Sequence, residues 1–191
     1  LRLLHLPRHG LMPSQQPTGP ARAGTRPVKH PVTARTKARR RAVEVLFEAD
    51  QRGLLAGGQA EDLSGEPGQE ADAGPAGRLR ALAAERAVFS ANHTQAPAYT
   101  RQILAGVADH LVDVDETIET YAQGWVLERM PAVDRAIARV ATWEIVYNDD
   151  VDVPVAVDEA LTLARMLSTD DSPRFLAGLL GRIGDLADTL R

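Results

Sequence analysis

Cations gathered at the start of a predicted amphipathic helix are the side chains in this sequence best suited to binding chemistry. They fall directly ahead of an apolar-periodic run, and they are Arg35, Lys37, Arg39, Arg40 and Arg41. Cations at a helix N-terminus oppose the helix dipole, so helix stability alone would not favour them there. Arginine suits phosphate because its planar fork donates two hydrogen bonds at once and also stacks on bases. The cluster therefore indicates an anionic partner, with a solvated charged face as the alternative.

Aromatic residues make up only 4% of the chain, and three of them could hold unpaired bases. Phe47 follows the cations on the same predicted helix, where base stacking and core packing are both open. Tyr121 and Phe175 fall at predicted helix ends, where stacking again competes with core packing. We assign the two tryptophans, Trp125 and Trp143, to the core or to packing between subdomains.

Charge is divided unevenly along the chain. Residues 1–41 carry ten Lys or Arg and no Asp or Glu, which leaves twelve basic and all 26 acidic residues for the rest. A segment of charge +10 thus precedes a body of charge −14. The basic end suits phosphate, and the acidic body discourages indiscriminate binding to nucleic acid.

Motifs for catalysis, cofactors and metals are missing from the sequence. The chain has no Cys, which excludes disulfides and thiolate chemistry, and its five His have no ligand spacing such as HExxH. There is no GxSxG, no GxGxxG and no Gly-rich phosphate loop ending in Lys. No apolar run approaches the roughly 20 residues that a membrane span needs, and we see no secretion signal. We therefore expect a cytoplasmic protein that is no enzyme and uses no metal or cofactor.

The elements that position these residues are all predicted to be helical, because apolar residues recur at helical spacing and no period-two run marks a strand. Residues 1–32, rich in Pro, Gly and Arg, are predicted to be a disordered tail, and residues 33–191 one helical domain. A long loop is expected at residues 53–77, where glycines and prolines punctuate small and acidic residues.

Seven helices are predicted in that domain. The first two cover about residues 34–52 and 78–90, and a long stripe over residues 99–121 gives two more, with Asp113 capping a restart. Prolines mark the remaining starts, because a missing N–H is harmless in the first turn of a helix. The last three helices therefore begin near Pro131, Pro154 and Pro173.

Several local strings together resemble the NusB family. Residues 35–41 with 42–47 resemble its arginine-rich motif and first helix, residues 99–107 its third helix, 134–145 its fifth, 152–154 with 158–160 its sixth and 171–175 its last. Each string is weak alone, but the order and spacing are specific over about residues 34–183. Two departures are Phe47, where Tyr is common, and Ala177 before Gly178, where the family usually has Asn.

The resemblance implies two packed three-helix groups and a role in transcription antitermination. NusB-like proteins pair with NusE, a small-subunit ribosomal protein, bind the boxA element of nascent ribosomal RNA and help RNA polymerase resist termination. Carried over residue by residue, the expected RNA-binding positions are Arg35, Lys37, Arg39, Arg40, Phe47, Tyr121 and Phe175, with Asp171 at the edge of that surface. Asp134 is expected on the NusE side, and formation of a homodimer is left open.

Two alternatives remain at this point. A NusB-like domain detached from an RNA cytosine methyltransferase would require a second, cofactor-binding domain after Arg191. A helical DNA-binding regulator would require an exposed recognition helix with Arg, Asn or Gln, whereas the later predicted helices are acidic on the outside.

Overall fold

The computed structural model describes residues 32–56, 74–88 and 95–191, and these ranges contain helices and no strand. This confirms the all-α prediction. Apart from Val32, the predicted tail lies outside the described residues, as does most of the predicted loop. The described part of Val32–Arg191 forms one compact unit.

The main helices follow one another along the chain as the periodicity predicts, with differences at some of their ends. They are α1 (Ala34–Gln51), α2 (Pro75–Val88), α3 (Ala98–Asp109), α4 (Leu111–Tyr121), the 3₁₀-helix η1 (Leu127–Arg129), α5 (Ala132–Tyr147), α6 (Val153–Leu167), α7 (Ser172–Asp185) and α8 (Ala187–Leu190). The last predicted helix is divided at Leu186 into α7 and α8. The break between α3 and α4 falls at His110, so Asp113 lies inside the first turn of α4 and is not its cap.

Proline fixes the starts of several helices. Pro131 is the N-cap of α5, while Pro154 and Pro173 lie within the first turns of α6 and α7. The first-turn N–H groups have no partner within the helix, so proline is tolerated there and its fixed φ favours the helix. Pro75 likewise begins α2, three residues earlier than predicted, so the end of the predicted loop is helical.

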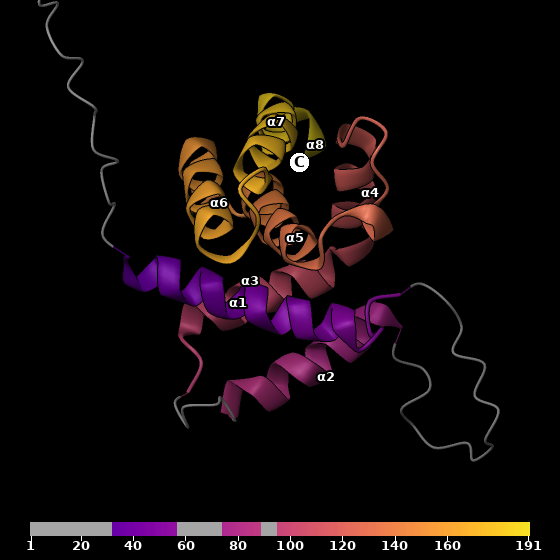
Figure 1. The fold of residues 1–191 in the computed structure, drawn as a ribbon. Helices are drawn as coiled ribbons and strands as arrows, with labels where there is room; N and C mark the ends of the chain where they lie inside the picture. The colour runs from indigo at the N-terminus through magenta and orange to yellow at the C-terminus, as the bar shows by residue number, and fades with distance from the viewer. Residues whose placement is uncertain (1–31, 57–73, 89–94) are drawn as a thin grey trace, which may run out of the picture. The chain divides into compact units, whose positions relative to one another are not determined.

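The helices pack as two groups that share α5 as a bridge. Helices α1, α2 and α3 contact one another, and α5 contacts α4, α6 and α7 while also packing against α1 and α3. Figure 1 shows α2 on one side of α1 and the α4–α7 group on the other. The two groups implied by the resemblance are therefore present, and the second holds four main helices.

Helix α5 is the centre of the core. Most of its side chains are buried, including Ile137 and Ile145, and large buried residues such as Ile118 and Leu176 come from the surrounding helices. Burial on nearly all sides also takes in polar side chains of α5, namely Asp134, Arg139, Thr142 and Glu144. The helices at the surface instead keep one polar face, and on α1 that face carries the cations.

Candidate nucleic-acid interface

The start of α1 is fixed by a capping box. The Thr33 hydroxyl accepts from the backbone N–H of Thr36 at 3.0 Å, and the Thr36 hydroxyl accepts from the Thr33 N–H at 3.3 Å. Two backbone donors that the helix leaves free are thereby satisfied. The Thr36 hydroxyl also donates to Glu159 of α6 at 3.1 Å. The cap therefore sets the first helical residue and ties the basic end of α1 to α6.

Arg39 lies inside the protein, contrary to its expected place on an RNA-binding surface. Its side chain is 3% exposed, and its Nε donates to both oxygens of Glu144, at 2.9 and 3.0 Å. Glu159 lies 3.3 Å from its Nη1. The cause is the helix register, because position 39 faces α5 and α6 while positions 37 and 40 face solvent. Arg39 therefore joins α1 to α5 and does not reach the surface.

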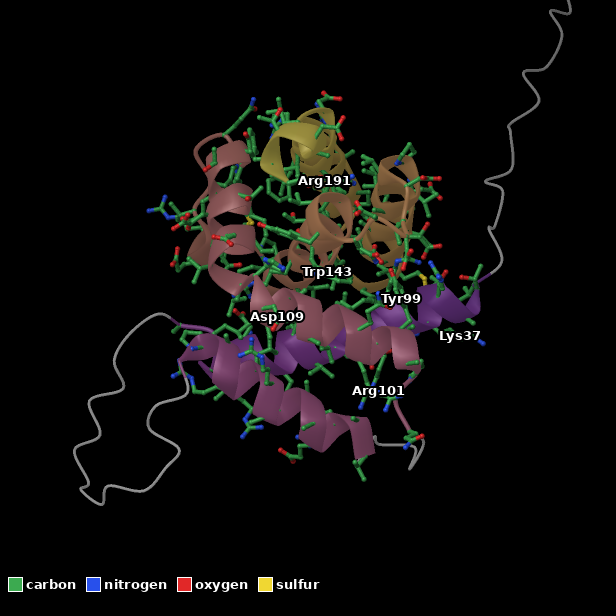
Figure 2. All side chains as sticks on the ribbon, turned by 180° about the vertical axis from the view of Figure 1, so that it is seen from behind. Lys37, Tyr99, Arg101, Asp109, Trp143 and Arg191 are labelled. Atoms are coloured by element: carbon green, nitrogen blue, oxygen red, sulfur yellow. The ribbon has the colours of Figure 1, made fainter. Side chains whose placement is uncertain are left out.

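A third partner completes this buried cluster. The Tyr99 hydroxyl of α3 donates to Glu144, and the Arg39 guanidinium lies 5.3 Å from the Tyr99 ring centroid. Burial raises the pKa of the Glu144 carboxyl, against the lowering effect of Arg39. Burial also raises the pKa of the Tyr99 phenol, which therefore stays a hydrogen-bond donor. Figure 2 shows Tyr99 at the same end of the α1–α3 pair as Lys37, with Asp109 at the opposite end.

The cations of α1 outside the core form what we call the basic face: Arg35, Lys37 and Arg40, which are exposed, and Arg41, which is partly buried. Arg35 is held over the Tyr99 ring, 4.8 Å from its centroid. Arg40 and Arg41 share Glu44, at 3.1 and 3.2 Å, so their charge is partly balanced. Among the ion pairs of the described residues none involves Arg35 or Lys37. These two side chains are the most available to an anionic ligand.

Phe47 continues the basic face along α1. It is 37% exposed and lies on the side of the helix that carries Arg40 and Glu44, because residues three and four apart share a face. The distance along the axis from Lys37 to Phe47 is about 15 Å at 1.5 Å per residue. Of the two roles open for Phe47, the exposed position favours contact with a ligand.

The second candidate surface lies around the turn after α4 and the start of α7. Tyr121 and Phe175 are both partly buried and pack against the core. Trp125 follows the same turn, and its side chain is 49% exposed, with the ring tilted by 55° against Phe175 at 5.8 Å between centroids. The core prediction therefore holds for Trp143, which is 5% exposed, and is wrong for Trp125.

The two acidic residues expected near the ligands occupy different environments. Asp171 is exposed at the N-cap of α7, and its side chain makes no cap hydrogen bond. Asp134 is 2% exposed, and its Oδ2 accepts from the Ser172 hydroxyl at 2.8 Å. Asp134 therefore fastens α5 to the start of α7, and its carboxylate lies below the surface on which a partner would rest.

An acidic groove of about 680 Å³ lies between α1, α4, η1 and α5, and Asp134 is not part of its lining. Arg139 donates to both oxygens of Asp115, at 2.7 and 3.0 Å, and Arg135 pairs with Asp50. These ion pairs join α5 to α4 and to α1 along the groove. Burial raises the pKa of Asp115, against hydrogen bonds from Arg139 that lower it. The acidic side chains in the lining outnumber these two arginines: Asp50, Asp115, Glu116, Glu119 and Glu128. Such a groove suits a basic partner.

Within residues 32–56, 74–88 and 95–191, no group of three or more His, Asp or Glu is placed to hold a metal ion. No helix in the described part of the chain is long and apolar enough to cross a membrane.

Comparison with known proteins shows the following similarities. The model of the NusB family matches residues 36–185. A transcription antitermination protein NusB of Beutenbergia cavernae is 50% identical over 162 residues, which cover 84% of this chain and 95% of that protein. The protein of the same name from Salinispora tropica is 46% identical, covering 81% and 97%.

Solved structures show the same fold. NusB of T. maritima superposes with a TM-score of 0.58 at 25% identity, covering 80% of this chain and 92% of that one. A chain from the crystal structure of a plectonemic RNA supercoil superposes with a TM-score of 0.57 at 20% identity, covering 81% and 96%.

Proposed function

Because this chain belongs to the NusB family, we propose that it is a transcription antitermination factor that works by binding RNA rather than by catalysis. Its ligand would be boxA-type single-stranded RNA in nascent ribosomal RNA transcripts, in the cytoplasm. The relatives named transcription antitermination proteins are matched over nearly their whole length, which favours this function over a detached methyltransferase domain. A DNA-binding regulator has less support, because the described exposed cations concentrate on α1 and not on a later recognition helix.

The single observation that carries the proposal is the basic face of α1. Arg35 and Lys37 are exposed and outside the described ion pairs, on a helix whose first turn has no acidic residue. A phosphate backbone releases condensed counterions when such side chains replace them, which gives affinity that falls steeply with salt. Phe47, on the same helix, would add a stacking surface for an unpaired base. We therefore assign the phosphate contacts to Arg35, Lys37 and Arg40, without Arg39.

The aromatic residues at the second surface extend the proposed path of the RNA. Tyr121 at the end of α4 and Phe175 near the start of α7 are each partly exposed, and Asp171 is exposed one turn before Phe175. Proteins hold single-stranded RNA largely by stacking aromatic side chains on its splayed bases, and Tyr121 and Phe175 are the aromatic residues proposed for that contact. The carboxylate of Asp171 would repel phosphate at the edge of this surface.

The partner we propose is NusE, within the RNA polymerase antitermination complex. A small-subunit ribosomal protein must itself present basic surface to bind ribosomal RNA, and the acidic groove beside α4 and α5 has the complementary charge. Asp134, which the family resemblance places on the NusE side, would act indirectly, since its buried hydrogen bond from Ser172 fixes α5 to α7. The two proteins would then present a composite surface to the RNA.

The test is the affinity of the purified chain for a short boxA-type RNA, alone and with NusE, against duplex DNA of equal length. We expect the single-stranded RNA to compete better than the duplex and NusE to increase its affinity. Equal binding of RNA and duplex DNA would contradict the proposal and favour the DNA-binding regulator. Binding that is insensitive to salt would contradict the role of the basic face.

A further inference from the structure

Trp125 is the large aromatic side chain whose placement the sequence does not explain, because nearly half of it faces solvent. We propose that Trp125, Phe175 and Arg182 form a subsite for one unpaired RNA nucleotide, in which Trp125 stacks on the base and Arg182 binds the phosphate. This inference rests on the proposed RNA-binding function. It adds two residues, Trp125 and Arg182, that the family resemblance did not bring forward.

The turn that carries Trp125 is held in an uncommon backbone conformation. Gln123 has φ of 51° and Gly124 φ of 87°, and a positive φ is rare for a residue with a side chain. The ends of the turn are anchored in the core by Ala122 and Leu127, both buried. The Leu127 N–H also donates to the Glu119 carboxylate at 3.2 Å. An anchored turn of this kind keeps the indole at the surface although burial would stabilise it.

The ring geometry leaves room for a base. Phe175 meets Trp125 in a tilted arrangement at 55°, and nearly half of Trp125 still faces solvent. Exposed tryptophan rings stack on nucleic-acid bases independently of sequence, since every base has a π-face. The Phe175 ring is itself partly buried, so it supports the indole while Trp125 supplies the exposed surface.

A cation stands next to this aromatic pair. The Nε–H of Arg182 donates to the backbone carbonyl of Tyr121 at 2.9 Å, which orients the guanidinium toward the turn after α4. None of the ion pairs in the described ranges involves Arg182, so its remaining donors have no carboxylate partner there. Phe175, Gly178 and Arg182 share one face of α7, at helical spacing.

Gly178 lies next to the Arg182 guanidinium on the same face of α7. An added Cβ at Gly178 would lie 3.5 Å from Arg182 Nη1, in ordinary contact. A planar guanidinium beside an aromatic pair is the combination that recognises a nucleotide, with the fork on phosphate and the rings on the base. An apolar protein side chain would use the rings and leave these donors unsatisfied, so the observations favour RNA over a protein partner.

Tryptophan fluorescence tests the proposal directly, because the chain has only Trp125 and the buried Trp143. We expect a short boxA-type RNA to quench the emission of the unmodified chain and leave Trp125→Phe unquenched. Trp125→Ala should weaken RNA binding about 5- to 140-fold, the effect of losing one stacked base, and Trp125→Phe should weaken it less. Arg182→Ala should flatten the salt dependence by roughly 0.7 in slope, whereas the exposed Arg165→Ala should not change it.

The outcomes separate this inference from the proposed function. RNA binding that is unchanged in Trp125→Ala, with no quenching in the unmodified chain, would overturn the subsite and leave RNA binding intact. Loss of NusE binding by Trp125→Ala at unchanged RNA affinity would place a protein on the indole and also overturn it. An unmodified chain that binds no RNA would overturn both. Melting temperatures of each variant establish that the fold is kept.

Discussion

The guanidinium of Arg39 lies against the carboxylate of Glu144 in the interior, and both side chains are 3% exposed or less. This pair divides the basic cluster of α1 into two parts with different roles. Arg39 points into the junction of α1, α5 and α6, where it holds the helix in place. Arg35, Lys37 and Arg40 point outward, where they are available to phosphate.

Replacing Arg39 with Leu should destabilise the fold by about 3–5 kcal/mol, because it leaves the buried carboxylate of Glu144 without its cation. Urea denaturation measures the loss. Arg40→Ala is the matched control, since it removes a solvent-exposed helical pair with Glu44 and should change the free energy of unfolding by less than about 1 kcal/mol. Equal stability of the two variants would contradict the structural role of Arg39.

Replacing Arg35, Lys37 and Arg40 together with Ala should weaken RNA binding and preserve the fold. The slope of log affinity against log salt should fall by roughly 2, at about 0.7 for each phosphate contact on a single strand. Replacement of Arg52, Arg101 and Arg165 with Ala removes the same charge from other exposed positions and serves as the control. If both triple variants lose the same slope, only net charge matters and the basic face is no specific site.

Gly106→Ala should destabilise the protein by about 1–3 kcal/mol through overpacking. An added Cβ at Gly106 of α3 would fall 2.1 Å from atoms of the indole of Trp143, a residue of α5 that packs against α3. Gly181 also lies in a helix, and a Cβ added there would have no atom within 4 Å. Gly181→Ala should therefore stabilise the fold by up to about 1 kcal/mol. Thermal unfolding of both variants checks the prediction, and a neutral Gly106→Ala would show that the indole can shift.

Asp171→Asn should tighten RNA binding and leave stability unchanged. The side chain makes no cap hydrogen bond, so its replacement removes a charge and little else. Relief of repulsion across a solvent-exposed surface is worth at most about 1 kcal/mol and shrinks as salt rises. RNA titrations at low and high salt measure it. Equal or weaker binding by the Asn variant at low salt would place Asp171 away from the RNA.

The ion pair between Glu48 and Arg86 should make stability depend on pH in the acid range. Arg86 donates to both oxygens of Glu48, at 2.8 and 2.6 Å, and these hydrogen bonds lower the pKa of Glu48 below its ordinary 4.5. A lowered native pKa contributes stability above the unfolded pKa, and that contribution is lost as the pH falls through the native value. The free energy of unfolding of Glu48→Gln should therefore be lower than that of the unmodified chain near neutral pH, and the two values should converge in acid. A difference that is constant with pH would contradict the assignment.

The sequence predicts the helices well wherever their ends are set locally. Pro131, Pro154 and Pro173 mark starts that the structure confirms to within two residues, because a proline acts on its own turn. The sequence predicts the break between α3 and α4 three residues later than His110, since its position depends on how the two helices pack on others. The sequence does not indicate the division at Leu186, because the apolar period continues unbroken into α8.

The candidate site is less predictable, because a side chain's role there depends on whether it faces the core or the solvent, and residue type alone does not show this. The sequence shows that Arg39 is basic, but its burial depends on Glu144, 105 residues away. Trp125 is a large apolar side chain of the kind usually found in a core, but the backbone of the preceding turn holds it at the surface. The Gln-Gly pair at positions 123 and 124 was a usable signal, since Gly before an aromatic residue often marks a tight turn.

The Thr33–Thr36 capping box has a thermodynamic consequence for ligand binding. Many arginine-rich segments fold only when RNA arrives, so part of the interaction energy is spent on ordering the backbone. Here the first turn is closed by its own threonines and fastened to Glu159 before any ligand is present. RNA would meet a preorganised helix, and calorimetry should show a heat-capacity change too small for coupled folding. Association would then be governed by electrostatic steering, with no helix-formation step along the way.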